Sequence, residues 1–522
     1  MIPLFSVSQV RTADEYAISQ LQIPGLILME NASLSIFSII REEYPGLNKS
    51  SLIGIVCGKG NNGGDGFALA RHFISSGFRV GVIYLAGAEE LKGDALTNFE
   101  ILQNVIHYSD ETSFMRQYKS VRDLKKLEGS QMIVDALLGT GATGSLKSPY
   151  AEIVRELNKF NGVRVALDIP TGLDADKGSG EEPFQADLTV TLAELKKGLF
   201  VNKGAVVSGE IKKGYIGLSA EYFDNFQVDT YVIEPEDAYY NLPQKAKDLY
   251  KYTAGKVLVI AGSKMLPGAS FMTASSVLHS GAGASILCFP ESAEGIIQSK
   301  LDEVIVLPYK DDGNGIFRKE NIQELKKRFE WMDVLAIGPG LGRDEETLEA
   351  VVETIRINKN KKIVIDADAL FAIGEGKYKN LDLSNCVLTP HQAEFANLLG
   401  IKLSELQSDV LTFGRRFAEE TGALLVLKGA PTVIFNADGE ALINSTGNPG
   451  MAKFGTGDVL TGIIAGFVAQ AEDTEGAVIS AVYLHSLSAD LLLKNKTEYG
   501  IMATDIIQNL PEAINFIRKS GV

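Results

Sequence analysis

Short apolar runs alternate with polar, glycine-containing turns along most of this chain. Residues 52–57, 79–85 and 132–135 are runs of this kind. Nearly continuous apolar segments of this length are typical of strands that are buried on both faces of a parallel sheet. Similar runs occur at residues 163–168, 187–192, 256–263, 282–288, 334–337, 363–365, 387–389 and 424–427. The pattern therefore predicts an α/β protein.

Two helices are predicted before the first strand. The sequence Thr-Ala-Asp-Glu at residues 12–15 fits a capping box, and Pro24 suits the first turn of a second helix. Apolar residues then recur at helical spacing, at Leu28, Ala32, Ile36 and Ile40. A strand–turn–helix–strand unit follows over residues 52–85.

A change in composition divides the chain into two parts. Around residues 219–247 the sequence becomes acidic, rich in tyrosine and irregular. With 522 residues, the chain is also too long for a single hydrophobic core. We therefore predict two α/β domains, residues 1–225 and 226–522.

The charge balance argues against some classes of partner. The chain has 66 acidic and 50 basic side chains and a formal net charge of −16, which disfavours non-specific binding to nucleic acids or anionic membranes. No apolar stretch reaches the roughly 18–20 residues of a membrane span, and residues 1–10 lack the features of a signal peptide. The three cysteines, Cys57, Cys288 and Cys386, are in apolar contexts, as expected of reduced core residues. We expect a cytoplasmic protein.

The first domain has polar turns after several predicted strands. Residues 58–63 match the G-x-G-x-x-G dinucleotide fingerprint, but residues 84–86 supply no acid for a ribose, so we discount that match. The two asparagines and the aspartate of residues 61–65 suit sugar hydroxyls or an alkali cation better. Because the carboxyl ends of parallel strands share one edge, we expect this turn, Asp135 and Asp168 to converge on one crevice. Each aspartate could instead cap a helix or close an Asx turn.

The second domain contains the sequence Gly-Thr-Gly-Asp at residues 455–458, directly before an apolar helical run. Glycines in such a turn let successive amide groups point into one concavity, and a helix N-terminus attracts anions, phosphate above all. The alternative is that Asp458 only caps the helix.

Residues 226–522 resemble the ribokinase-like superfamily, and more narrowly its NAD(P)H-hydrate dehydratase branch. The motifs that carry this resemblance are residues 338–342 (GPGLG), 366–370 (DADAL), 389–391 (TPH), 428–429 (KG), 448–452 (NPGMA) and 455–458 (GTGD). The first domain is similar to the partner epimerase. Its motifs are residues 29–32 (MENA), 61–66 (NNGGDG), 135–141 (DALLGTG) and 168–174 (DIPTGLD).

The resemblance implies a Rossmann-like three-layer domain followed by a ribokinase-like α/β domain. It implies that the first domain interconverts the R and S epimers of hydrated NADH and NADPH. The second domain would dehydrate the S form, with ADP converted to AMP and phosphate. Potassium and magnesium are the implied ions, and a homo-oligomer is the implied assembly.

The resemblance also implies roles for individual residues. Asp168 would be the acid/base of epimerisation, with Lys196 as a weaker candidate, and Asp458 would be the base of the dehydratase. Hydrate contacts in the first domain would be Asn61, Asn62, Gly63, Gly64, Asp65, Gly139, Thr140, Gly141, Ala142, Thr143, Gly144, Ser145 and Asp168. Potassium ligands would be Asn62, Asp135 and Thr171, all with oxygen donors. In the second domain, hydrate contacts would be Ala269, Gly340, His391 and Asp458, and nucleotide contacts Lys428, Gly429, Ala430, Pro431, Thr432 and Gly457.

Some positions depart from the commonest family pattern. Thr171 and Thr456 replace serine and keep a hydroxyl. Ala393 replaces a frequent glycine, so the resemblance does not fix how closely a substrate approaches the backbone beside His391. His391 could instead be a helix-cap residue. Two other functions remain: a small-molecule kinase of the ribokinase superfamily with an accessory Rossmann-like domain, and a first domain that serves only for binding or assembly.

Overall fold

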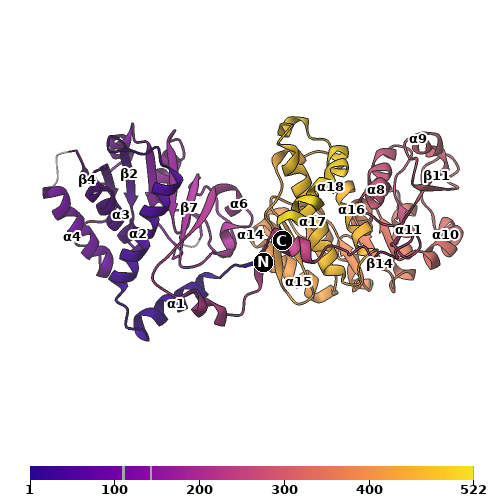
Figure 1. Ribbon diagram of the computed structural model, residues 1–522, viewed down its shortest axis with the longest axis horizontal. Coiled ribbons are helices and arrows are strands. Elements are labelled where there is room, and N and C mark those ends of the chain that lie inside the picture. The colour runs from indigo at the N-terminus through magenta and orange to yellow at the C-terminus, as the bar shows by residue number, and fades with distance from the viewer. Residues whose placement is uncertain (109–111, 142–143, 521–522) are drawn as a thin grey trace. The chain divides into compact units, whose positions relative to one another are not determined.

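The protein is described by a computed structural model of residues 1–108, 112–141 and 144–520 (Figure 1). It divides into two compact units, which we call the N-terminal unit (Pro3–Val228) and the C-terminal unit (Met1–Ile2 with Asp229–Val522). Each unit is built on its own β-sheet. Ala142 and Thr143, two of the predicted hydrate contacts, lie outside the described residues.

The described part of the N-terminal unit contains a seven-stranded sheet in the order β4-β3-β2-β5-β6-β7-β8. All neighbouring strands in it are parallel. The strands are β2 (Leu52–Cys57), β3 (Arg79–Tyr84), β4 (Phe114–Gln117), β5 (Met132–Ala136), β6 (Val163–Leu167), β7 (Leu188–Leu192) and β8 (Glu210–Gly214). Five of them confirm predicted strands, whereas β4 and β8, at the two edges, are too polar to be recognised from the sequence.

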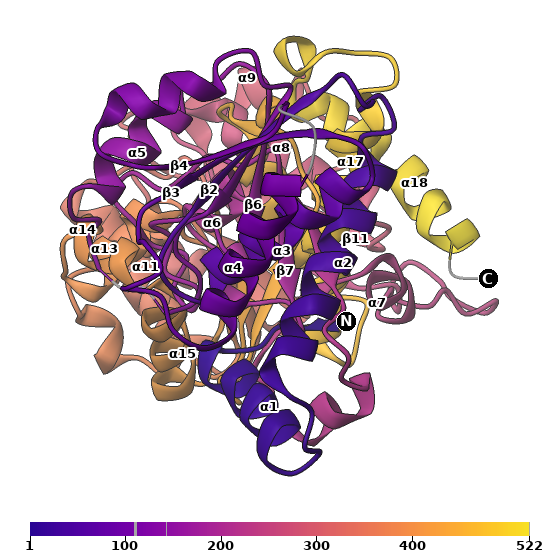
Figure 2. The ribbon, with the colours of Figure 1, turned by 90° about the vertical axis from the view of Figure 1, so that its left-hand side faces the viewer.

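Helices cover both faces of this sheet. The helical segments are α1 (Val7–Ser19), α2 (Gly25–Glu43), α3 (Asn61–Ser75), α4 (Gly93–Tyr108), α5 (Tyr150–Leu157), α6 (Gly204–Val207), η1 (Val121–Leu127), η2 (Lys197–Leu199) and η3 (Ala220–Asn225). Ile53 and Ile55 of β2 pack in one core with α2, α3 and α4. Val56 of the same strand packs on the other face of the sheet, with η1 and α5. Figure 2 shows α5 separated from α2 and α4 by the strands. The predicted three-layer α/β arrangement is confirmed.

The first helix begins earlier than predicted. Ser6 is its N-cap, because Gln9 N donates to Ser6 Oγ (3.3 Å) and Ser6 N donates to Gln9 Oε1 (2.8 Å). Thr12 lies inside the helix, where its hydroxyl donates to Ser8 O (2.9 Å). The capping box predicted at residues 12–15 is therefore wrong.

The described part of the C-terminal unit contains an eleven-stranded sheet, ordered β1-β9-β18-β17-β16-β15-β14-β13-β10-β11-β12. Its strands are β1 (Ile2–Pro3), β9 (Thr230–Ile233), β10 (Lys256–Ile260), β11 (Ala284–Pro290), β12 (Ile305–Tyr309), β13 (Val334–Ile337), β14 (Lys362–Ile365), β15 (Cys386–Leu388), β16 (Leu424–Leu427), β17 (Thr432–Phe435) and β18 (Ala441–Asn444). From β12 to β16 the strands are parallel, whereas β16, β17 and β18 pair in antiparallel fashion. The sequence did not predict this antiparallel extension.

The helices of the C-terminal unit include the one that follows the Gly-Thr-Gly-Asp turn. They are α7 (Pro235–Tyr240), α8 (Pro267–His279), α9 (Glu294–Gln298), α10 (Lys319–Trp331), α11 (Glu345–Ile357), α12 (Asp368–Ala372), α13 (Gln392–Leu399), α14 (Leu403–Ser408), α15 (Val410–Thr421), α16 (Thr456–Val468), α17 (Thr474–Leu492) and α18 (Ala503–Ser520), with short 3₁₀ segments η4 (Glu291–Ala293), η5 (Lys377–Asn380), η6 (Pro449–Met451) and η7 (Glu498–Gly500). Residues of α8, α16, α17 and α18 form one apolar core with Val257 and Val259 of β10. The carboxyl end of β14 lies beside α16, because Thr461 of α16 donates to Asp366, which directly follows β14.

Two expectations from composition can be compared with this fold. All three cysteines are buried and free, as expected of reduced core residues. Among the described residues, no helix combines the length and the apolar character that a membrane crossing needs.

Candidate active sites

Three turns of the N-terminal unit meet at the carboxyl edge of its sheet. A methyl group placed on Gly139, which follows β5, would lie 3.4 Å from Asn62 Cβ and 3.5 Å from Asp168 Oδ2. Asn62 belongs to the start of α3, and Asp168 directly follows β6. The structure therefore brings these residues together in one place.

The first of these turns is not the loop that we expected. Helix α3 begins at Asn61, so Asn62 to Asp65 lie in its first turns. Glycine is required there because the backbone packs closely: a Cβ on Gly63 would lie 2.1 Å from the carbonyl oxygen of Gly58. A side chain on Gly66 would similarly collide with Ala136 of β5. The glycines thus serve helix–strand contact, and they bring the helix N-terminus to the sheet edge.

Asn62, Asp135 and Thr171 suit a cation with oxygen ligands. Asn62 is buried, and within the described residues neither its Oδ1 nor its Nδ2 has a hydrogen-bond partner. Asp135 is fully buried and accepts from Thr171 N and Thr171 Oγ1, each at 2.8 Å. Burial raises the pKa of Asp135 to about 6, although these hydrogen bonds oppose the rise. An unpartnered buried amide is uncommon in folded proteins and fits a ligand at this position.

Asp168 forms an ion pair with Lys196, which is buried. Lys196 Nζ lies 2.6 Å from Asp168 Oδ1, which also accepts from Leu192 N (3.1 Å). Asp168 has a left-handed backbone, with φ of 64°. Such a conformation is strained for most residues but tolerated by aspartate, and strained residues concentrate at functional sites.

Two further carboxyl groups surround this pair, and only one of them was predicted. Burial raises the pKa of Asp14, on α1, to about 6, with Lys196 opposing the rise and Asp168 adding to it. Burial also raises the pKa of Asp65 well above its ordinary value, and the charges of Asp168 and Asp14 add to this. Asp14 was missed, although it interrupts the buried stripe of Val10, Ala13 and Ala17 on its helix.

The remaining predicted contacts of this unit lie on the turn after β5. Arg11 of α1 donates from Nη2 to Thr140 O (3.1 Å), so α1 holds one end of the turn. Gly141, Gly144 and Ser145 are exposed. This part of the turn is therefore open to a ligand.

In the C-terminal unit, Gly455 shapes the turn before α16. It has a left-handed backbone with φ of 97°, and a side chain there would press on Met272 of α8 at 2.6 Å. Gly455 is also the N-cap of α16 and has no side-chain capping bond. Asp458 lies in the first turn. The interpretation of Asp458 as the N-cap residue is therefore wrong, and its carboxyl group is available for another role.

A hydrogen-bonded network at the ends of two central strands lies beside the start of α16. Lys428 Nζ lies 2.8 Å from Asp366 Oδ1, and Thr461 Oγ1 donates to Asp366 Oδ2 at 2.6 Å. A Cβ on Gly457 would lie 3.3 Å from the same Lys428 ammonium. The ammonium is therefore next to the amide groups at the start of α16, where an anion would bind.

Burial and neighbouring charges shift the pKa values of Asp458 and Lys428. Burial raises the pKa of Asp458 to about 7, the charge of Asp366 adds to the rise, and Lys428 opposes it. Burial alone would lower the pKa of Lys428, but Asp366 and other carboxylates raise it overall. A pKa near 7 suits a general base at physiological pH. Asp366 was not among the predicted site residues, although it stands in the DADAL motif.

Ala269 and Gly340, two predicted hydrate contacts, are neighbours. A Cβ on Gly340 would lie 3.0 Å from Ala269 Cβ, and the φ of Gly340 is 67°. The predicted nucleotide contacts Gly429, Ala430 and Pro431 lie in the turn between β16 and β17, and Thr432 begins β17. Gly429 and Ala430 are exposed.

His391 is the N-cap of α13. Its Nδ1 accepts from Glu394 N (3.1 Å), and its own amide donates to Glu394 Oε2 (2.8 Å). The helix-cap interpretation of His391 is thus supported. A β-bridge also pairs His391 with Lys428, and its side chain is 57% exposed, so a second role in substrate contact is compatible with this geometry.

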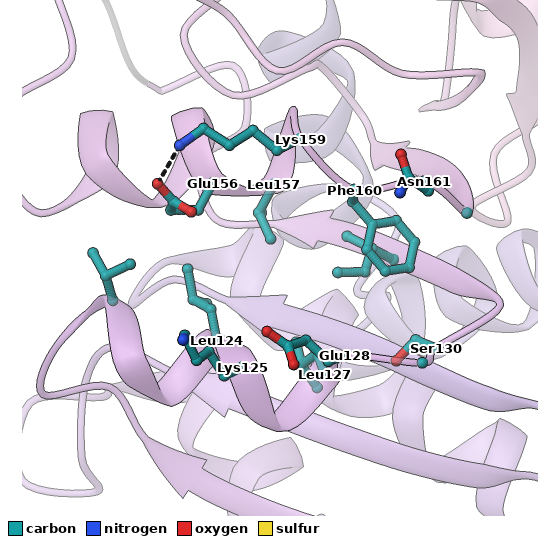
Figure 3. A pocket seen from close by; sticks show the side chains of 14 residues that line it. Leu124, Lys125, Leu127, Glu128, Ser130, Glu156, Leu157, Lys159, Phe160 and Asn161 are labelled. Atoms are coloured by element: carbon teal, nitrogen blue, oxygen red, sulfur yellow. Dashed lines mark hydrogen bonds and ion pairs between the residues drawn. The ribbon is translucent and has the colours of Figure 1, made fainter.

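A cavity of about 510 Å³ in the N-terminal unit lies away from these residues (Figure 3). It lies between η1 and α5, where Leu124, Leu157 and Phe160 line it. Ser130 and Gly162, which also line it, precede β5 and β6. The cavity is therefore at the amino ends of these strands, opposite the candidate site.

Two α/β units, each with a carboxylate at the carboxyl edge of its sheet, define a two-site enzyme. The family model described as NAD(P)H-hydrate dehydratase matches residues 257–512, and the model described as YjeF-related protein N-terminus matches residues 25–198. The bifunctional NAD(P)H-hydrate repair enzyme of Moorella thermoacetica is 36% identical over 522 residues, which cover 99% of this chain and 97% of the relative. The chain therefore belongs to the family of bifunctional NAD(P)H-hydrate repair enzymes.

Solved structures match the C-terminal unit. A ribokinase-like superfamily protein from Enterococcus faecalis is 31% identical, with a TM-score of 0.50, over 56% of this chain and 98% of that one. The ADP/ATP-dependent NAD(P)H-hydrate dehydratase of Bacillus subtilis, co-crystallised with ATP and Mg²⁺, is 28% identical, with a TM-score of 0.46, over 55% of this chain and 98% of that one. The first of these confirms the ribokinase-like fold.

Proposed function

We propose that this enzyme repairs hydrated NADH and NADPH, with epimerisation in the N-terminal unit and dehydration of the S epimer in the C-terminal unit. The proposal rests on one observation above all: a chain related over its whole length to bifunctional repair enzymes has a sheet-edge carboxylate in each unit. The full-length relationship favours this function over a small-molecule kinase with an accessory domain.

Epimerisation requires that a bond at the hydroxyl-bearing ring carbon break and re-form on the other face. A base that takes the hydroxyl proton and returns it can serve both directions. Asp168 is the proposed acid/base, because it faces the same edge as Gly139 and the start of α3. Asn61 to Asp65 and the turn from Gly139 to Ser145 are the proposed hydrate contacts.

Dehydration requires that a poor leaving group, hydroxide, be activated. Phosphorylation of the hydroxyl followed by elimination achieves this without strong acid. Asp458 is proposed to accept the hydroxyl proton, while the amide groups near Gly457 and the Lys428 ammonium stabilise phosphoryl charge. ADP is the proposed phosphoryl donor, and magnesium would neutralise its phosphate charge.

Potassium is the proposed ion of the N-terminal unit. Asn62, Asp135 and Thr171 would hold it, and the unpartnered buried amide of Asn62 is the observation that supports this choice. Hard oxygen donors match the preference of an alkali cation. Exchange of potassium for choline should slow epimerisation and leave dehydration of the pure S epimer unchanged. Equal epimerisation rates in both salts would refute the potassium site.

The activity can be tested with one optical assay. The enzyme is mixed with both epimers of hydrated NADPH, ADP, magnesium and potassium, and the near-ultraviolet absorbance of the dihydronicotinamide ring is followed. Full recovery of both epimers is expected. Asp168→Asn should restrict recovery to the S epimer, and Asp458→Asn should abolish recovery of both. A stable phosphorylated product in place of NADPH would instead identify a kinase.

The cellular setting is part of the same proposal. Three buried, reduced cysteines are compatible with a cytoplasmic enzyme. We also propose a homo-oligomer, which size-exclusion chromatography with light scattering would test. A single species of monomer mass would refute it.

A further inference from the structure

The two carboxylate oxygens of Asp168 have different surroundings. Oδ1 accepts from Lys196 Nζ (2.6 Å) and from the amide of Leu192 (3.1 Å). Oδ2 is the oxygen that faces Gly139, whose hypothetical Cβ would lie 3.5 Å away. Only Oδ2 is therefore directed at the predicted hydrate-binding turn.

Lys196 is enclosed by oxygen atoms. Besides Asp168, its ammonium donates to Leu192 O (2.6 Å) and Thr191 Oγ1 (3.0 Å), and its side chain is only 1% exposed. The carbonyl oxygen of Glu194 also lies 3.4 Å from Nζ, so the three donors of the ammonium have four acceptors within the protein. The ammonium has no spare proton directed at the site, so it does not itself exchange a proton with a substrate.

We infer that Lys196 is a positioning residue, which binds Oδ1 of Asp168 and leaves Oδ2 as the atom that exchanges a proton with the hydrate. This inference rests on the proposed epimerase function. It assigns Lys196 a different role from the direct acid/base role considered for it from the sequence.

Charge gives a second reason for this arrangement. Asp168 has two other ionisable neighbours, Asp14 on α1 and Asp65 on α3, whose electrostatic coupling to it is described above. Neighbouring carboxyl groups disfavour the ionised form of one another, and an adjacent cation opposes that effect. Lys196 is the cation in direct contact with Asp168. Without it, Asp168 would lie among carboxyl groups with no cation in direct contact.

The experiment compares Lys196→Met with a matched control, Lys213→Met. Lys213 is 46% exposed and pairs with the Glu194 side chain, which is 9% exposed (2.9 Å), so its replacement removes a nearby positive charge that does not contact Asp168. Conversion of the pure R epimer is measured from pH 5 to 9. Dehydration of the pure S epimer is recorded in the same samples.

Lys196→Met should lower kcat for R-epimer conversion at pH 7 by about tenfold or more, and move the pH midpoint of the remaining activity upwards. Dehydration of the S epimer and both activities of Lys213→Met should be unchanged. Wild-type kcat and an unchanged midpoint in Lys196→Met would overturn the inference. Wild-type enzyme that does not convert the R epimer would refute the proposed function itself.

A milder variant covers the case in which Lys196→Met does not fold. Thr191→Val removes one acceptor of the ammonium and keeps its charge. It should lower kcat for the R epimer by about two- to tenfold and leave KM unchanged, since one neutral hydrogen bond is worth about 0.5–1.5 kcal/mol. An unchanged kcat in this variant would also overturn the inference.

Discussion

Each unit contains a lysine–aspartate ion pair at the carboxyl edge of its sheet, and in each pair a different residue type is the enclosed member. In the N-terminal unit, the side chain of Lys196 is 1% exposed and that of Asp168 is 14% exposed. In the C-terminal unit, Asp366 is 2% exposed and Lys428 is 20% exposed. The accessible partner is thus a carboxylate in one unit and an ammonium in the other.

This difference agrees with the chemistry proposed for each unit. An accessible carboxylate can exchange a proton, whereas an accessible ammonium beside a helix N-terminus can bind phosphate. The enclosed residue holds the accessible one in position and stabilises its charged form. The same pair of residue types can therefore support two functions, depending on which member the fold encloses.

The turns that hold the two pairs share one backbone feature. A non-glycine residue with positive φ follows the strand in each: Asp168 at 64° and Ala367, next to Asp366, at 50°. Alanine has no side-chain polar group to compensate a left-handed backbone. The turn after β14 therefore depends on its neighbours, including the hydrogen bond from Gly342 N to Asp368 Oδ2 (2.9 Å).

The largest expected effect separates the two units. Asp458→Asn should lower the dehydration rate by about 10²–10⁴-fold, because a general base in the transition state contributes that much. Epimerisation should be unchanged. Asp438→Asn, which changes an exposed residue of the same unit, is the matched control. If NMR of the two epimers showed that Asp458→Asn also loses epimerisation, the two units would not act separately.

A charge-removal series tests the ion pair of the C-terminal unit, in which the aspartate is enclosed and the lysine is accessible. Lys428→Met should destabilise the unit by about 3–5 kcal/mol, because it leaves Asp366 buried without its cation. Adding Asp366→Asn should recover most of that free energy of unfolding but not the KM for ADP. Urea denaturation and initial rates measure the two quantities, with the exposed Lys359→Met as control. If the double variant recovered its ADP affinity, Lys428 would not be the phosphate-facing group.

The ionisation of Asp458 predicts a pH dependence. Its pKa is raised to about 7, so the carboxylate form that acts as base is lost as the pH falls through 7. The dehydration rate should fall about tenfold per pH unit below that value and level off above it. Rates at saturating S hydrate from pH 5 to 9 provide the test. A flat profile in wild-type enzyme would exclude Asp458 as the titrating base.

The smallest effect concerns His391. His391→Ala should lower the free energy of unfolding by about 0.5–2 kcal/mol, because α13 loses its N-cap. His391→Asn should restore that stability, since asparagine is a good N-cap residue. We expect the KM for the S hydrate to be raised in both variants. A normal KM in His391→Asn would mean that His391 acts only as a cap.

Much of the fold could be predicted where the apolar pattern was strong. The runs at residues 52–57 and 334–337 correspond to β2 and β13 without any shift. Failures occurred where local signals were weak or misleading. The glycines and asparagines of residues 61–66 suggested a loop, but close packing against β2 and β5 makes them helical. Residues 230–233, within the irregular segment, form a strand because β18 offers them an edge.

The sequence alone determined the two α/β units, the family and the identity of most candidate residues, because strand-end turns and the Gly-Thr-Gly-Asp motif are local patterns. Only the tertiary structure decided which of these residues meet and which member of each ion pair is enclosed. Asp14 comes close enough to Asp168 for their charges to interact, and Thr461 donates to Asp366, although the members of each pair are in distant segments. Burial and charge interactions at these positions depend on how distant segments pack together. Local sequence patterns do not show that packing.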